Sequence, residues 1–97
     1  METQMHSIHF KADKKLLDFI QDRLDKLEHF NQHVISAEVF LRLEKDKEKE
    51  NKITEIKLLV PGKELFAKRQ CRTFEEAADE TIDALKRQIM KEKTKHQ

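Results

Sequence analysis

The chain contains one cysteine, one glycine and one proline among 97 residues, and each scarcity excludes a class of protein. The single cysteine, Cys71, cannot form an internal disulfide, which favours a reducing compartment such as the cytosol. One glycine leaves no room for a glycine-rich phosphate loop, so the composition argues against a nucleotide-binding enzyme. No apolar run approaches the roughly 18 residues that span a bilayer, and residues 1–15 lack the apolar stretch of a secretory signal. We therefore expect a cytoplasmic protein without membrane contact.

Charge is what the chain has in abundance, since 40% of its residues are charged and 37% are apolar. This length and composition suit one small domain with a compact core. Residues 86–97 hold five fixed cations and one anion, a net charge of +4, whereas the whole chain carries +1 and the remainder therefore −3. The preceding segment holds five carboxylates and no cation. They are Glu75, Glu76, Asp79, Glu80 and Asp83.

The first half of the chain predicts a strand, a helix and a second strand. Thr3–Ile8 alternates weakly and reads as the first strand. Asp13 is a suitable N-cap for a helix to about Phe30, whose apolar residues form one stripe of period 3.6. This stripe contains Leu16, Ile20, Leu24 and Leu27. Ser36–Glu44 alternates at period 2 and predicts the second strand. Its inward residues are Ala37, Val39, Leu41 and Leu43.

The second half predicts two more strands and a long helix. Mixed charge over Lys45–Lys52 indicates a solvated hairpin loop before a strand at Ile53–Val60. Pro61-Gly62 fits the centre of a type II turn, and Lys63–Cys71 is the fourth strand. The inward residues of these strands are Ile56, Leu58, Val60, Leu65, Ala67 and Cys71.

A capping box, Thr73-Phe74-Glu75-Glu76, opens the last helix, which we expect to fray from about residue 93. Its buried positions are Phe74, Ala78, Ile82, Leu85 and Ile89, with Ala77 and Thr81 at the border. The order βαβββα predicts an α+β fold with a four-stranded mixed sheet in the order 1-2-3-4. The first strand pair is parallel, and both helices cover the same face.

No group of side chains suits catalysis or metal binding. Ser7 and Ser36 are the only serines, and neither lies in a nucleophile motif. Cys71 is expected in the core, where a thiol is usually inert. Two histidine pairs lack further Cys or His ligands at metal-binding spacing. They are His6 with His9, and His29 with His33. The sequence thus predicts no enzymatic activity, catalytic residue, metal, cofactor or small-molecule substrate.

Cations near the chain end favour an anion-binding surface. Arg87, Lys91 and Lys95 stack at i, i+4 and i+8, where each like-charge pair costs roughly 0.2–0.5 kcal/mol. The alternative is a solvated helix end, because cations complement the helix dipole by about 0.3–1 kcal/mol each. That alternative explains one or two cations better than a repelling column of three. Lys86 flanks the apolar stripe on its other side.

Other cations extend this surface if the two helices lie side by side. Arg23 projects within the apolar arc of the first helix, and Lys26 lies at its edge. The end of the fourth strand adds Lys68, Arg69 and Arg72. Together these residues predict a broad phosphate-binding surface that does not read bases.

The sheet face away from the helices offers an alternative. It carries Phe40, Leu59 and Phe66, which suit stacking on single-stranded bases or contact with another protein. This alternative is a protein-interaction regulatory module, and the same face is a candidate for self-association.

Three segments resemble the short ribosome hibernation-promoting factors, bacterial ribosome-associated translation inhibitors also labelled sigma-factor modulators. They are Lys26-Leu27-Glu28, Val39-Phe40-Leu41-Arg42-Leu43-Glu44, and Leu85-Lys86-Arg87-Gln88-Ile89 followed by Lys91. The resemblance spans about Thr3 to Lys95. The chain departs from the family where Thr73-Phe74-Glu75 replaces the frequent Asp-Met-Tyr, so the aromatic ring usual at position 75 is missing. Its acidic helix start also argues against generic duplex-RNA binding.

The resemblance implies a fold like a double-stranded-RNA-binding domain with an added first strand. It implies a single ribosome-binding domain over residues 1–97, without the dimerising tail domain of long members. The implied partner is the small ribosomal subunit and its rRNA, bound in the decoding region where tRNA and mRNA would sit. The matching rRNA-binding positions are Arg23, Lys26, Lys86, Arg87 and Lys91, with Lys95 and Arg69 matching less closely.

Overall fold

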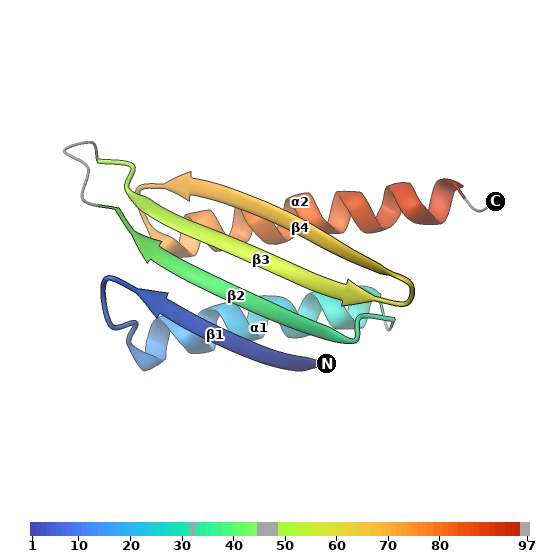
Figure 1. Cartoon of the computed structure of the whole chain (residues 1–97), viewed down its shortest axis with the longest axis horizontal. Helices are drawn as coiled ribbons and strands as arrows, with labels where there is room; N and C mark the ends of the chain where they lie inside the picture. The colour runs from blue at the N-terminus through green and yellow to red at the C-terminus, as the bar shows by residue number, and fades with distance from the viewer. Residues whose placement is uncertain (32, 45–48, 96–97) are drawn as a thin grey trace.

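The computed structural model describes residues 1–31, 33–44 and 49–95, with residues 92–95 described by their backbone only. Six elements follow one another in the predicted order βαβββα (Figure 1). They are β1 (Glu2–Ile8), α1 (Lys14–Phe30), β2 (Ser36–Leu43), β3 (Lys52–Val60), β4 (Lys63–Cys71) and α2 (Phe74–Lys95). The predicted α+β fold is therefore confirmed.

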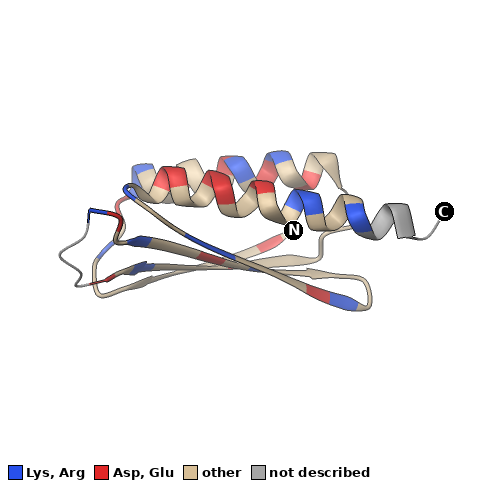
Figure 2. Cartoon of the chain, turned by 90° about the horizontal axis from the view of Figure 1, so that it is seen from above, with Lys and Arg blue, Asp and Glu red and all other residues tan. Residues whose placement is uncertain are grey.

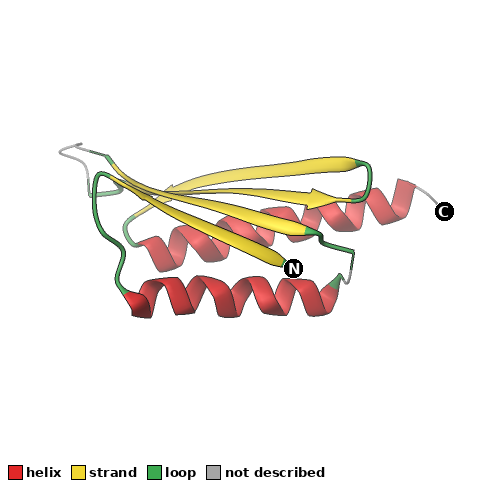
Figure 3. Ribbon diagram, turned by 60° about the horizontal axis from the view of Figure 1, so that its bottom comes forward, coloured by secondary structure: helices red, strands yellow, loops and turns green. Residues whose placement is uncertain are grey.

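The four strands form one sheet in the order β1-β2-β3-β4. β1 pairs with β2 in parallel, and the other two pairs are antiparallel, as predicted. Both helices cover the same face of the sheet and leave the other face open (Figures 1 and 3). Because Val39 lies opposite Ile56, and Ile56 opposite Ala67, the apolar side chains of three strands meet on the helix-covered face.

Helix α1 begins at its predicted cap and buries its predicted stripe. The side chain of Asp13 accepts a hydrogen bond from the backbone N–H of Leu16 at 2.9 Å. This bond satisfies one of the amide groups that a helix start leaves unpaired. The four stripe residues predicted from the sequence are all buried. The first helix therefore follows from local signals alone.

Thr73 caps helix α2, because its hydroxyl accepts a hydrogen bond from the backbone N–H of Glu76 at 3.0 Å. The five predicted buried positions are confirmed, but the placement of Ala77 and Thr81 at the border is wrong, because both are fully buried. Helix α2 packs against both β3 and β4, so its buried arc is wider than one stripe. The Thr81 hydroxyl lies 3.2 Å from the carbonyl oxygen of Thr54 in β3 and 2.7 Å from that of Ala77.

The connections between strands agree with their sequence signals. Gly62 has a φ of 76°, the left-handed conformation expected at the third position of a type II turn. The predicted loop over Lys45–Lys52 lies partly outside the described residues, at 45–48, and Lys52 already belongs to β3. The expected fraying from about residue 93 stays a prediction. Among the described residues, no helix is long and apolar enough to cross a membrane.

Candidate nucleic-acid interface

The two helices lie side by side and run in the same direction (Figure 3). The guanidinium Nε of Arg23 in α1 donates to the Asp79 carboxylate of α2 at 2.8 Å. Seven residues further along each helix, the Lys86 ammonium lies 4.5 Å from the ring centroid of Phe30. The helices are therefore parallel and aligned, so each segment of α1 has a fixed neighbour on α2.

Four cations occupy the end of the helix pair where α1 finishes, and we call this set the basic end. They are Lys26, Lys86, Arg87 and Lys91, all exposed. Lys86 packs on the Phe30 ring, and Arg87 forms an ion pair with Asp83 one turn earlier. At about 1.5 Å per residue, Lys86 and Lys91 are separated by about 7.5 Å along the axis. The α2 cations follow its acidic segment (Figure 2), so one end of the helix surface suits a polyanion.

Arg23 lies on the side of α1 that faces α2, but next to the acidic half of α2. Besides its bond to Asp79, its Nη1 lies 3.2 Å from a carboxylate oxygen of Asp22. Its guanidinium carbon lies 4.4 Å from the centroid of the Phe19 ring. Since Asp79 precedes Arg87 by eight residues, Arg23 lies about 12 Å before Arg87 along the helix axis. The shared basic ridge predicted from Arg23 to Arg87 is thus interrupted by paired carboxylates.

The structure does not bring Arg69 to the basic end. Arg69 is exposed on the helix side of β4, and its Nη1 donates to the Lys68 carbonyl. The amide of Gln88 donates to the carbonyl of Phe66 at 2.9 Å and so fixes where α2 crosses this strand. Arg69 follows Phe66 by three residues, about 10 Å along β4 toward the acidic half of α2. The side chain of Lys95 lies outside the described part of α2.

A family model described as sigma 54 modulation protein / S30EA ribosomal protein matches residues 3–97. The chain belongs to this family. The predicted resemblance is therefore confirmed, and membership identifies a ribosome-associated modulation protein.

Individual relatives of this S30EA-family protein agree. Ribosome hibernation promoting factors of Pseudomonas putida are 27% identical over all 97 residues, which cover 91% of those proteins. A ribosomal subunit interface protein from Coxiella burnetii superposes with a TM-score of 0.85 at 17% identity, over 97% of this chain and 99% of that one. The N-terminal domain of Thermus thermophilus Protein Y gives 0.77 at 19% identity, over 92% and 96%. At such identities the two structures support the fold alone.

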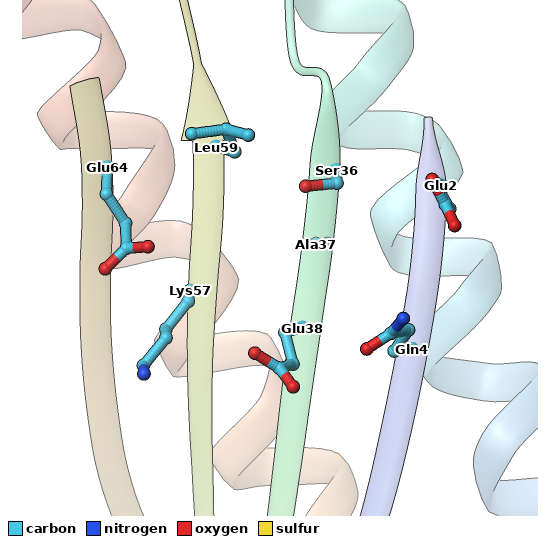
Figure 4. A pocket seen from close by; sticks show the side chains of 8 residues that line it. All are labelled: Glu2, Gln4, Ser36, Ala37, Glu38, Lys57, Leu59 and Glu64. Atoms are coloured by element: carbon cyan, nitrogen blue, oxygen red, sulfur yellow. The ribbon is translucent and has the colours of Figure 1, made fainter. Parts of the chain in front are cut away.

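The open sheet face of this S30EA-family protein is less apolar than its sequence suggested. Leu59 and Phe66 are 42% and 47% exposed. Phe40 is partly covered, because the His6 ring stacks on it at 5.0 Å and the Lys57 ammonium lies 5.7 Å from its centroid. A nearby depression is lined by residues of all four strands, and six of the eight are polar or charged (Figure 4). Its lining is Glu2, Gln4, Ser36, Ala37, Glu38, Lys57, Leu59 and Glu64.

Cys71 is buried where β4 meets the first turns of α2. Its thiol donates to the Glu80 carboxylate at 3.1 Å. Burial, this hydrogen bond and the neighbouring carboxylates raise the pKa of the thiol to about 12. Ligand atoms of Cys71, Glu76 and Glu80 lie within 4.8 Å of one another. At neutral pH the thiol therefore stays protonated, as expected for a structural cysteine.

Sequence reasoning missed the partners of the predicted cations. The Lys86 ammonium packs on the Phe30 ring, and Arg23 donates to Asp79. Neither Phe30 nor Asp79 was predicted from the sequence to be part of a site. The available signal was the predicted sheet topology, in which the first and fourth strands run in the same direction, so that the helices that follow them also run in the same direction. An acidic segment on one helix then meets the cations of the other.

Proposed function

We propose that this protein is a hibernation factor that inhibits translation by binding the small ribosomal subunit in its decoding region. The basic end carries this proposal, because Lys86, Arg87 and Lys91 follow one another along exposed positions of α2 and Lys26 is exposed on the neighbouring α1. Family membership supplies the ribosome as the partner. The relatives named hibernation promoting factors support the inhibitory role.

The mechanism we propose is steric and electrostatic, without a chemical step. Lysine and arginine side chains bind rRNA phosphates and release their counterions, which gives affinity without sequence readout. The bound domain then occupies space that tRNA and mRNA need. The acidic half of α2 repels phosphate, so contact with rRNA is limited to the basic end.

Sucrose-gradient sedimentation of purified subunits with added protein, at 50 mM and 200 mM salt, tests this proposal. We expect the protein to sediment with the small subunit and to leave it as salt rises. A filter-binding competition then follows tRNA binding to the same subunits. If the protein never sediments with the small subunit, or if bound protein leaves tRNA binding unchanged, the proposed function is wrong.

A protein-interaction module on the open sheet face is the second candidate, favoured by the exposure of Leu59 and Phe66. It predicts that Phe40→Ser with Phe66→Ser abolishes ribosome association, whereas charge reversal at the basic end has little effect. Self-association through this face belongs to the same hypothesis. One sedimentation series separates the candidates by comparing the loss of ribosome association in the sheet-face variant with the loss in the charge-reversal variant.

A further inference from the structure

We propose that Asp79 and Asp22 compete intramolecularly with RNA phosphate for Arg23, and so make this protein selective against generic duplex RNA. This inference rests on the proposed rRNA binding and deepens it. It assigns a specificity role to two carboxylates of the helix pair. Their effect is on the choice of RNA, because they limit the surface along which phosphates can bind.

The contacts of Arg23 carry the argument. Its guanidinium donates from Nε to Asp79 at 2.8 Å and from Nη1 to Asp22 at 3.2 Å, while one face lies over the Phe19 ring. Asp22 also pairs with Lys26 at 3.3 Å. Two cations and two carboxylates thus form a group of zero net charge. The two carboxylates occupy two of the five N–H donors of Arg23, so a phosphate at the remaining donors lies beside two negative charges.

Two cations of α2 differ in this respect, whereas Arg87 is paired with Asp83. Among the described side chains, Lys86 and Lys91 form no ion pair with a carboxylate. The side chain of Arg23 is 34% exposed, against 67% for Lys26. The helix pair therefore presents Lys86 and Lys91 without a carboxylate partner toward one end and, about 10 Å before Lys86 along the axis, Arg23 between two carboxylates. An RNA whose phosphates contact only the basic end therefore binds without repulsion from Asp22 and Asp79.

A generic A-form duplex meets a penalty here. Its phosphates continue along both strands, so a duplex laid along the helices also faces Asp22, Asp79 and the rest of the acidic half. The phosphates and these carboxylates carry like charges and repel one another. Neutralising Asp79 removes one repulsive charge and turns a charge-assisted bond to Nε of Arg23 into a weaker neutral one, which a phosphate displaces more easily.

Asp79→Asn tests the inference. We expect it to tighten binding to a 20-base-pair RNA duplex of unrelated sequence by about two- to fivefold at low salt, the effect of one exposed charge contact. The slope of log affinity against log salt should steepen by about 0.7–0.9, the value for one added phosphate. Affinity for small subunits should change less, so the preference for subunits over duplex falls. Fluorescence anisotropy measures the duplex, and sedimentation measures the subunits.

Asp25→Asn is the matched control. It removes the same charge from the same helix pair, but Asp25 accepts from Gln21 on the side of α1 near Thr3 of β1, away from α2. The double variant Arg23→Gln/Asp79→Asn should lose most of the gain in affinity. Equal gains for Asp25→Asn and Asp79→Asn, or a full gain in the double variant, overturn the inference, because net charge alone would then explain the effect.

Asp22→Asn gives an independent route if Asp79→Asn lowers the melting temperature below that of the assay. It removes the negative charge beside Nη1 of Arg23, and the same tightening is expected. Unchanged duplex affinity in this folded variant overturns the inference. Failure of the proposed function has a different signature, which is loss of subunit binding by the wild-type protein itself.

Discussion

Reversing two charges at the basic end, Arg87→Glu with Lys91→Glu, should abolish most ribosome binding while the protein stays folded. Both side chains are exposed, and the ion pair of Arg87 with Asp83 joins residues four apart on α2. Losing this pair and replacing it with like-charge contacts costs about 1 kcal/mol or less. The melting temperature should therefore fall by at most about 8 °C.

The effect on binding is larger. Each exposed charge contact is worth up to about 1 kcal/mol, so losing two weakens binding by up to about 30-fold, and the introduced carboxylates add repulsion. Two of the four phosphate contacts also disappear, so the magnitude of the salt slope should fall by about 1.4–1.8. Sedimentation with small subunits measures the affinity, and circular dichroism checks the fold.

The control is Lys14→Glu with Lys15→Glu. These exposed lysines open α1, about 18 Å along the axis from Lys26. This control changes net charge equally, so it should leave most of the binding intact. If the two double variants bind small subunits equally well, the location assigned to the site is refuted.

Three further changes test the fold. Thr81→Val should lower unfolding free energy by about 1 kcal/mol, because it removes a buried hydroxyl that contacts backbone carbonyls in β3 and α2; an unchanged urea midpoint would contradict this. Asp13→Ala should cost about 1 kcal/mol through the lost cap of α1, measured by thermal melting against Asp13→Asn, which keeps the cap. Because folding raises the pKa of Cys71 from 9.0 to about 12, its stabilising contribution is present below pH 9 and lost as pH rises toward 12. Cys71→Ser, read by urea titration across that range, should show a smaller decline than wild type, and an equal decline would argue against the shift.

Local sequence signals predicted the elements of this protein because each element is specified within its own segment. Asp13 caps α1 through a bond to Leu16, three residues away. The turn before β4 needs only a glycine with positive φ. Alternation within β2 placed its buried residues correctly, because a half-buried strand has period 2 whatever its neighbours are.

Sequence patterns were weaker where distant segments meet. Arg23 and Asp79 lie 56 positions apart, so no local spacing predicts their bond. The burial of Ala77 and Thr81 depends on how α2 rests over two strands, and the helix pattern alone cannot supply that orientation. The cations were therefore identified from the sequence. Which of them pair with carboxylates became apparent only in the tertiary structure.

The salt dependence of small-subunit binding by the wild-type protein tests the central claim most directly. Four cations at the basic end, each engaging one phosphate, predict that log affinity falls with log salt at a slope of about −2.8 to −3.6. This measurement needs no variant and reports the number of phosphate contacts. A slope near zero would contradict an electrostatic interface at this end of the helix pair.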